Sequence, residues 1–509
     1  MTIVTRELDR MIAFALEHKL LDQGDALFAR NLLLDAVKLD APEAYQPDTE
    51  PLPPTLTPML DRLSAHATEL GLIDDSGDAR DRYATRLCGL LMPPPSSIRD
   101  MFYALLNGRS PDAATDWFYA ICRASDYIRV DHIAKNKLFI GHSPYGDLEI
   151  TINLSKPEKD PRDIVAQLKA PKLGYPTCML CVENPGYAGR TGFPARQNHR
   201  MIPLTLGDAP WHMQYSPYLY YDEHCIVLNE KHTPMHIDRE NMERMFEFVD
   251  MLPHYFIGSN ADLPIVGGSI LSHDHFQGGR HVFPMDLAPI SVPLKAPVDG
   301  VEAGVVAWPM TCIRLRSQDK HKLIELGTQM LAAWRAYSDE SLDILAHTDQ
   351  PHNTITPTVR RDGDSYLLNL VLRNNRTTAE HPMGLFHPHA DLHHIKKENI
   401  GLIEVMGLFI LPGRLLSELD ELTGYLTGDI DPATEPHPDS PLAKHHGWAK
   451  GIANLTGTAL SNAEAEAAIQ TALTAKCTRV LKDAGVYKLD EAGQAGLLRF
   501  LGSVGYASI

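Results

Sequence analysis

The chain has 509 residues, enough for roughly two to four domains of ordinary size. It carries 47 Lys and Arg against 65 Asp and Glu, a net charge of −18. A surface this acidic repels the phosphates of nucleic acids and of anionic membranes, so we expect neither as a partner. No apolar run reaches the ~18–20 residues of a membrane span, and the N-terminal residues do not predict a secretion signal. Seven cysteines, an odd number, fit a reducing compartment better than a disulfide framework, so we expect a cytoplasmic protein.

Residues 1–133 are predicted to be mainly helical. Apolar residues recur at three- and four-residue spacing from Leu8 to Leu16, which places them on one face of a helix. The prolines of 41–58 cannot continue a helix and predict a connector. Helical spacing returns in 60–107 and 111–123.

Beyond about residue 135, short β-type runs are broken by glycine and proline. The predicted strands are 148–154, 224–228, 366–373 and 402–411, the last of them apolar enough to be buried on both faces. Asp238 is expected to cap the start of a helix that ends near Pro253. A further helix is expected over 462–483. Strands without regular βαβ alternation predict an α+β fold rather than a doubly wound sheet.

Cys178 and Cys181 form a C-x-x-C pair. The helix-breaking residues 183–186 follow directly, whereas a redox pair normally opens a helix. The same spacing is the usual first half of a tetrahedral zinc site. Taken alone, the pair fits a metal site and a chance occurrence equally well.

A row of polar residues follows an apolar, glycine-rich segment. In an extended strand, His273, His275 and Gln277 would share one face, with Asp274 and Phe276 on the other. Gly278-Gly279 would then let a ligand approach the backbone closely. We interpret this row as a functional site rather than as a solvated edge.

Two further histidine features are informative only in context. His232 lies in a predicted loop between a buried strand and the helix capped by Asp238, where a histidine is ordinarily a surface residue. His387-Pro388-His389 is followed by His393 and His394, so this cluster also has metal-ligand spacing.

Together these motifs resemble the galactose-1-phosphate uridylyltransferases of the histidine-triad superfamily, and most closely their second, mainly bacterial class. The resemblance spans nearly the whole chain. It is carried by 178–193 (CMLCVENPGYAGRTGF), 215–232 (YSPYLYYDEHCIVLNEKH), 267–279 (GGSILSHDHFQGG), 373–376 (RNNR) and 387–411 (HPHADLHHIKKENIGLIEVMGLFIL).

The resemblance implies two histidine-triad-like antiparallel-sheet units with an added N-terminal helical section and a helical C-terminus. The corresponding segments are 1–133, 134–300 with the nucleophile, 301–415 and 416–509. It also implies a homodimer.

Carried over residue by residue, the resemblance implies a structural zinc ion held by Cys178, Cys181, His232 and His273. The nucleophile falls on His275, and Gln277 falls on the glutamine that hydrogen-bonds the transferred phosphoryl group. The implied substrates are a UDP-sugar and a hexose 1-phosphate, which exchange UMP by a ping-pong mechanism through a uridylyl-histidine, in galactose metabolism. Galactose 1-phosphate is the expected hexose 1-phosphate.

The residues that bind substrate are less sharply indicated. Asn260 is expected to contact the nucleotide, as in the family. Arginines are needed near the phosphates, and the candidates are Arg190, Arg196, Arg373 and Arg376, of which Arg373 and Arg376 are taken as substrate-binding.

His389 is the rival nucleophile. Asp391 stands two residues on, where a glutamine would be needed, and an acid there would repel phosphate. His387 and His389 match better the pair that binds a second, structural metal in the first class of the family. The other ligands of that metal are not located in this sequence.

Two alternative functions stay open at this stage. One is a histidine-triad phosphorylase or hydrolase that acts on dinucleotides, with water or inorganic phosphate as acceptor. The other is a zinc-stabilised module that senses nucleotides or sugars without turnover.

Overall fold

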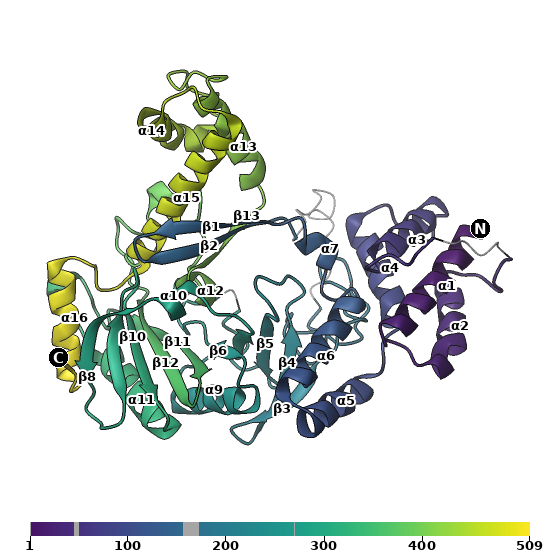
Figure 1. Cartoon of the computed structure of the whole chain (residues 1–509), viewed down its shortest axis with the longest axis horizontal. Coiled ribbons are helices and arrows are strands. Elements are labelled where there is room, and N and C mark those ends of the chain that lie inside the picture. The colour runs from purple at the N-terminus through teal and green to yellow at the C-terminus, as the bar shows by residue number, and fades with distance from the viewer. Residues whose placement is uncertain (1, 45–49, 156–172, 269) are drawn as a thin grey trace. The chain divides into compact units, whose positions relative to one another are not determined.

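The computed structural model describes residues 2–44, 50–155, 173–268 and 270–509 (Figure 1). Helices come first, antiparallel strands dominate the middle and helices return at the end, which confirms the predicted α+β class. Residues 45–49 of the predicted connector and Ser269 of the 267–279 motif lie outside the described residues. No helix in the described ranges combines the length and the apolar character needed to cross a bilayer.

The chain forms two compact units built from interleaved segments. Unit 1 combines Met1–Lys135, Ser155–Thr233 and His273–Gly279, and unit 2 combines Asn136–Leu154, Pro234–Ser272 and Arg280–Ile509. The four-segment division expected from the family resemblance stays a prediction.

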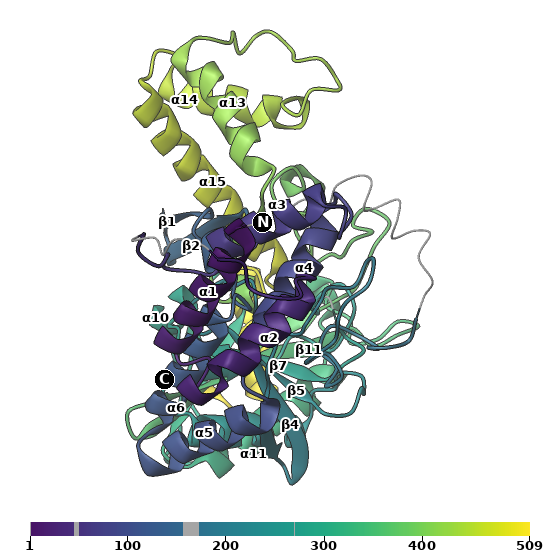
Figure 2. The ribbon, with the colours of Figure 1, turned by 90° about the vertical axis from the view of Figure 1, so that its right-hand side faces the viewer.

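The N-terminal helices of unit 1 form where they were predicted. They are α1 (Thr2–Glu17), η1 (Gln23–Asp25), α2 (Ala26–Ala36), α3 (Thr57–Glu69), α4 (Gly77–Gly89), α5 (Pro95–Gly108), α6 (Pro111–Ala124) and α7 (Val130–Ile133). The predicted stripe of α1 is buried at Leu8, Met11 and Ala15. Helices α1 to α4 pack side by side in both views (Figures 1 and 2).

Four antiparallel strands complete unit 1 in the order β3-β4-β5-β7. They are β3 (Ile202–Leu206), β4 (Ala209–Tyr215), β5 (Cys225–Asn229) and β7 (His275–Gly279). Leu228 of β5 lies opposite His275, and Ile226 lies opposite Gln277. Phe276 points to the other face of the sheet and stacks on Trp211, with ring centroids 5.1 Å apart. The predicted alternation of His275, Phe276 and Gln277 is therefore what positions the candidate site.

Gly279 ends β7 in a conformation that favours glycine, with φ +147°. A Cβ atom there would lie 2.7 Å from the carbonyl oxygen of Glu223 and 2.8 Å from the ring of Tyr221. The sequence suggested that Gly278-Gly279 leaves room for a ligand. At Gly279 the chain's own 221–223 turn occupies that room.

Unit 2 contains strands in the order β14-β8-β9-β10-β12-β11-β6. They are β6 (Phe256–Gly258), β8 (Ile290–Lys295), β9 (Glu302–Val306), β10 (Cys312–Ser317), β11 (Asn353–Asp362), β12 (Ser365–Asn374) and β14 (Ala507–Ser508). Helices α9 (Arg239–Met251) and α11 (Lys320–Ala336) pack on this sheet (Figure 1). The predicted cap of α9 is present, because the Asp238 carboxylate accepts the N–H of Asn241.

A smaller sheet and the C-terminal helices complete unit 2. The sheet is β1 (Lys137–Ser143), β2 (Gly146–Asn153) and β13 (Leu408–Pro412); the helices are α10 (Pro284–Leu287), η2 (Glu340–Leu342), η3 (Ala390–Leu392), α12 (Leu402–Val405), α13 (Leu415–Thr427), η4 (Ala443–His445), α14 (His446–Thr456), α15 (Asn462–Ala484) and α16 (Glu491–Ser503). Helices α13, α14 and α15 pack against one another, and α15 packs on β1 (Figures 1 and 2). The expected C-terminal helical section is confirmed.

The prediction of one strand over 402–411 is wrong in its first half. Residues 402–405 form the short helix α12, and only β13 is extended. The reason is local capping at the start of α12: the Glu404 carboxylate accepts the N–H of Gly401 at 3.2 Å. The side-chain oxygen of Asn260 also accepts the N–H of Leu402 at 2.9 Å.

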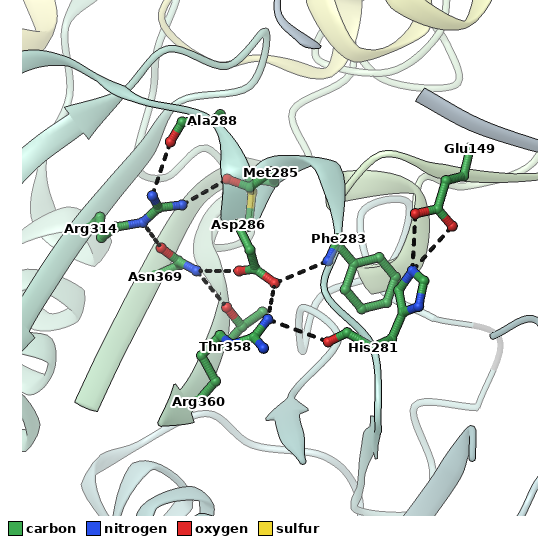
Figure 3. A network of polar contacts seen from close by, with 10 residues as sticks. All are labelled: Glu149, His281, Phe283, Met285, Asp286, Ala288, Arg314, Thr358, Arg360 and Asn369. Atoms are coloured by element: carbon green, nitrogen blue, oxygen red, sulfur yellow. Dashed lines mark hydrogen bonds and ion pairs between the residues drawn. The ribbon is translucent and has the colours of Figure 1, made fainter. Parts of the chain in front are cut away.

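A buried polar network joins α10 to the strands of unit 2 (Figure 3). The Asp286 carboxylate accepts hydrogen bonds from Arg360 at 2.8 Å and from Asn369 at 3.2 Å. Arg314 donates to the side-chain oxygen of Asn369 at 2.8 Å and to two backbone carbonyls near α10. At the edge of the network, His281 pairs with Glu149 of β2 at 3.1 Å. The carboxylate of Asp286 is the group on which these contacts converge.

Replacing this carboxylate should therefore destabilise unit 2. Asp286→Ala leaves the guanidinium of Arg360 without its carboxylate partner, and we expect the free energy of unfolding to fall by about 3 kcal/mol in a urea titration. The matched control is Glu302→Ala, which removes an ion pair to Arg316 whose glutamate side chain is 77% exposed. That change should cost less than about 1 kcal/mol. Equal losses for the two variants would contradict the role given to Asp286.

Candidate active site and metal centre

Four side chains from three segments of unit 1 converge, and they are the set that the family resemblance implies. The ligand atoms of Cys178, Cys181, His232 and His273 all lie within 4.8 Å of one another. Cys178 Sγ lies 3.5 Å from Cys181 Sγ and 3.2 Å from His273 Nδ1. Cys181 Sγ lies 3.2 Å from His232 Nδ1. The donor set is two thiols and two imidazoles, so this cluster can bind a metal ion.

Backbone contacts orient the members of the cluster. The Nε2–H of His273 donates to the carbonyl oxygen of Asn229 at 2.7 Å, which turns Nδ1 toward the thiols. The side-chain amide of Asn184 donates to the carbonyls of Cys178 at 2.9 Å and Cys181 at 2.8 Å, which holds the C-x-x-C turn. The helix-breaking sequence after Cys181 therefore shapes the cluster.

His275 lies two residues after the cluster, at the start of β7. Its Nδ1–H donates to the carbonyl oxygen of His273 at 2.7 Å. Burial lowers the pKa of His275 to about 4, so the ring is neutral at pH 7. Its Nε2 atom has no hydrogen-bond partner among the described residues and is not sealed from solvent, although the residue is only 6% exposed. The free lone pair of this imidazole therefore lies on Nε2.

Gln277 lies on the same face of β7 as His275 and has a partner that the sequence analysis missed. Its Oε1 atom is 3.2 Å from Nε2 of His224, which comes directly before β5. The signal was present in the pattern, because His224, Ile226 and Leu228 alternate along one strand face. Only the β5–β7 register, however, shows that this face is the one of Gln277 and His275.

The two candidate arginines of unit 1, Arg190 and Arg196, differ in the contacts of their guanidinium groups. Arg190 donates to the carbonyls of Tyr175 and Leu173, at 2.8 Å and 3.1 Å, and lies over the ring of Phe193. Arg196 lines a cavity of about 110 Å³, and its guanidinium forms no ion pair or side-chain hydrogen bond within the described part of the chain. Its guanidinium lies over the ring of Tyr127, 5.9 Å from the centroid, so of the two it is the arginine whose N–H groups are not used by the described protein.

The substrate-binding residues predicted in unit 2 are engaged by the protein. Asn260 caps α12 through its side-chain oxygen. Arg373 is 1% exposed and donates to the carbonyl oxygen of Ile400 at 2.8 Å, while burial lowers its pKa to about 10. Arg376 donates to the carbonyl and the carboxylate of Asp343, at 2.7 Å and 3.1 Å. Their roles in substrate binding stay predictions.

His387 and His389 have backbone partners in unit 2. His387 Nδ1 lies 3.2 Å from the carbonyl oxygen of Pro388, and His389 Nε2 lies 3.3 Å from that of Leu385. Over the described ranges, three or more ligating side chains converge only at the Cys178 cluster. A second metal at His387 and His389 stays a prediction, because no third ligating side chain converges on this pair among the described residues.

Two family models match the part of the chain that contains the candidate site. The model of the galactose-1-phosphate uridyl transferase N-terminal domain matches residues 35–234, and that of the C-terminal domain matches residues 247–439. Together they cover most of the chain, including every residue of the cluster, His275 and Gln277. The chain belongs to the galactose-1-phosphate uridyl transferase family. The resemblance inferred from the motifs is thereby confirmed.

Relatives within the galactose-1-phosphate uridyl transferase family match over nearly their full length. A galactose-1-phosphate uridylyltransferase from Caldanaerobacter subterraneus subsp. tengcongensis is 47% identical, over 99% of this chain and 98% of that protein. Those from Clostridium acetobutylicum and Lactiplantibacillus plantarum are 45% and 47% identical, over 98% and 94% of this chain and 99% and 95% of their own. Among solved structures, yeast Ap4A phosphorylase aligns over 64% of this chain and 89% of its own, with 12% identity and a TM-score of 0.32.

Proposed function

We propose that the protein is a uridylyltransferase that exchanges UMP between UDP-glucose and a hexose 1-phosphate through a covalent uridylyl-His275. The observation that carries this proposal is the geometry of His275, whose Nδ1–H is bound to a backbone carbonyl while Nε2 is left free. Membership of the family and the names of its full-length relatives support the reaction class.

The first half-reaction follows from this geometry. The lone pair on Nε2 of His275 attacks the α-phosphorus of UDP-glucose; a P–N bond forms, and the P–O bond to glucose 1-phosphate breaks with its electrons leaving on that oxygen. No base is needed, because burial keeps the pKa of His275 near 4 and the ring is already neutral. The Nδ1–H bond to the His273 carbonyl strengthens as the ring becomes positive.

The second half-reaction reverses the first. An oxygen of the incoming hexose 1-phosphate attacks the same phosphorus, the P–N bond breaks and neutral imidazole leaves. The side-chain amide of Gln277, on the same strand face, supplies N–H donors to the phosphoryl oxygens, where negative charge is concentrated. Arg196 is the arginine that we favour for a phosphate contact, since its guanidinium lies over the ring of Tyr127 and forms no ion pair or side-chain hydrogen bond among the described residues.

We also propose that the ion bound by the Cys178 cluster is zinc. Tetrahedral zinc, with bonds of about 2.3 Å to sulfur and 2.0 Å to nitrogen, separates its ligand atoms by roughly 3.3–3.8 Å. The sulfur–sulfur distance of 3.5 Å and the sulfur–nitrogen distances of 3.2 Å to 3.7 Å fit this geometry. Four protein ligands leave no open position, so the zinc would be structural and would fix His273, whose carbonyl orients the nucleophile.

The zinc proposal predicts one zinc ion per chain by elemental analysis, and its loss in Cys178→Ser, because a hydroxyl is a poor substitute for a thiolate. The control is Cys477→Ser, which changes a buried free cysteine of α15 and should keep the metal. An active wild-type protein that contains no metal would show that the cluster is held by packing alone.

The covalent intermediate predicts a UMP adduct when the protein is incubated with UDP-glucose alone and measured by intact mass. The adduct should be labile to acid, as a phosphoramidate is, and absent from His275→Ala. The control is His437→Ala, which changes a loop histidine whose side chain is 77% exposed and should leave the adduct undiminished. An adduct of normal yield on His275→Ala would rule out His275 as the nucleophile.

The acceptor is tested by exchange. Labelled glucose 1-phosphate should enter UDP-glucose, and galactose 1-phosphate should be consumed with release of glucose 1-phosphate. A phosphorylase or hydrolase would instead release nucleotide with water or inorganic phosphate and without any hexose 1-phosphate. A sensor module would bind UDP-glucose without exchange.

Three further features are proposed, the first from the family and the other two from the composition of the chain. They are a homodimer, a cytoplasmic location and the absence of nucleic acid as a partner. All seven cysteines are free, which suits a reducing compartment. The dimer is tested by light scattering, where a mass of one 56.5 kDa chain would contradict it.

A further inference from the structure

His224 lies beside the proposed phosphoryl-binding amide, and although it falls within the 215–232 motif, no role was predicted for it. The residue is 3% exposed, and its ring packs on those of Tyr220 and Tyr221, with centroids 5.5 Å and 4.5 Å away. Its backbone is fixed as well, since its carbonyl accepts the N–H of Ser216 at 2.8 Å. The ring therefore has one orientation, with Nε2 directed at Oε1 of Gln277, 3.2 Å away.

The surroundings of the ring decide which nitrogen carries the proton. Burial lowers the pKa of His224 to about 4, so the imidazole is neutral at pH 7 and has a single N–H. The Nδ1 atom is buried and has no hydrogen-bond partner within the described ranges. A buried N–H without an acceptor is the costlier of the two arrangements, so the proton lies on Nε2 and is donated to Gln277.

This donor fixes which way round the amide of Gln277 lies. The two ends of a carboxamide have almost the same shape but opposite hydrogen-bonding character. With its oxygen held by His224, the amide directs its nitrogen away from that ring. The two N–H groups of Gln277 have no acceptor among the described residues, so they are free for a ligand.

We infer that His224 is a positioning residue that holds the Gln277 amide with its N–H groups toward the transferred phosphoryl group; this role rests on the proposed function. Without His224 the amide could turn over and present its oxygen to the negatively charged phosphoryl oxygens. The residue acts through Gln277 and touches neither substrate nor the reacting atoms.

The test compares two substitutions of equal length. His224→Gln places an N–H donor at about the position of Nε2, whereas His224→Met fills the same space without a donor. We expect His224→Met to slow formation of the UMP adduct by roughly 10- to 100-fold, with little change in the affinity for UDP-glucose. His224→Gln should regain most of the rate. Equal rates in the two variants, with equal thermal stability, would overturn the inference.

A double substitution separates positioning from packing. If His224 acts only through Gln277, His224→Met should have little further effect in a Gln277→Ala background. A merely structural role would give the full rate loss again in that background, and this result would contradict the inference.

The tautomer is tested without catalysis, by NMR of protein labelled with ¹⁵N-histidine. The His224 signals, identified by their absence in His224→Gln, should show a neutral ring protonated at Nε2 at pH 7. A proton on Nδ1, or a charged ring, would overturn the inference even in a fully active enzyme. A wild-type protein that forms no adduct would instead overturn the proposed function, and with it the positioning role of His224 in that reaction. The spectrum would still decide which end of the Gln277 amide His224 holds.

Discussion

The hydrogen bond from Nδ1 of His275 to the carbonyl of His273 is the contact on which the site depends. It commits one nitrogen of the ring to the backbone and leaves the other free to react. The same residue, His273, directs its own side chain at two thiols and its Nε2–H at the backbone of β5. A single residue therefore links the Cys178 cluster to the proposed nucleophile. Any movement of the cluster would reach the imidazole of His275 through one backbone carbonyl.

The two imidazoles on this sheet face are both buried and neutral, but they are used in opposite ways. His275 donates its Nδ1–H to the backbone, so its Nε2 carries the free lone pair. His224 donates its Nε2–H to Gln277, and its Nδ1 has no hydrogen-bond partner among the described residues. Burial keeps both rings neutral at pH 7, because it lowers the pKa of each to about 4. The division of roles is set by backbone carbonyls and aromatic neighbours rather than by nearby charges.

Periodicity in the sequence predicted much of the fold and the centre of the site. The alternation of His275, Phe276 and Gln277, the Asp238 cap and the long helix α15 are local features, and all of them are present. The helix at 402–405 depends partly on Asn260, which lies 142 residues earlier in the chain, so the apolar run alone favoured a strand. The burial of Arg373 and its contact with the carbonyl of Ile400 were not predictable from the sequence, and its role in substrate binding stays a prediction. The contact between His224 and Gln277 needed the β5–β7 register, which no local pattern encodes.

The packing at Gly279 has a consequence for how the chain can vary in length. The carbonyl oxygen of Glu223 lies where a side chain at 279 would begin, so the turn before β5 fits against the end of β7 without spare space. A slip of β5 by one place against β7, which a change of length in this turn would favour, would turn His224 to the opposite face of the sheet. Homologous chains should therefore tolerate changes in length in their surface connectors but hold this short segment at constant length.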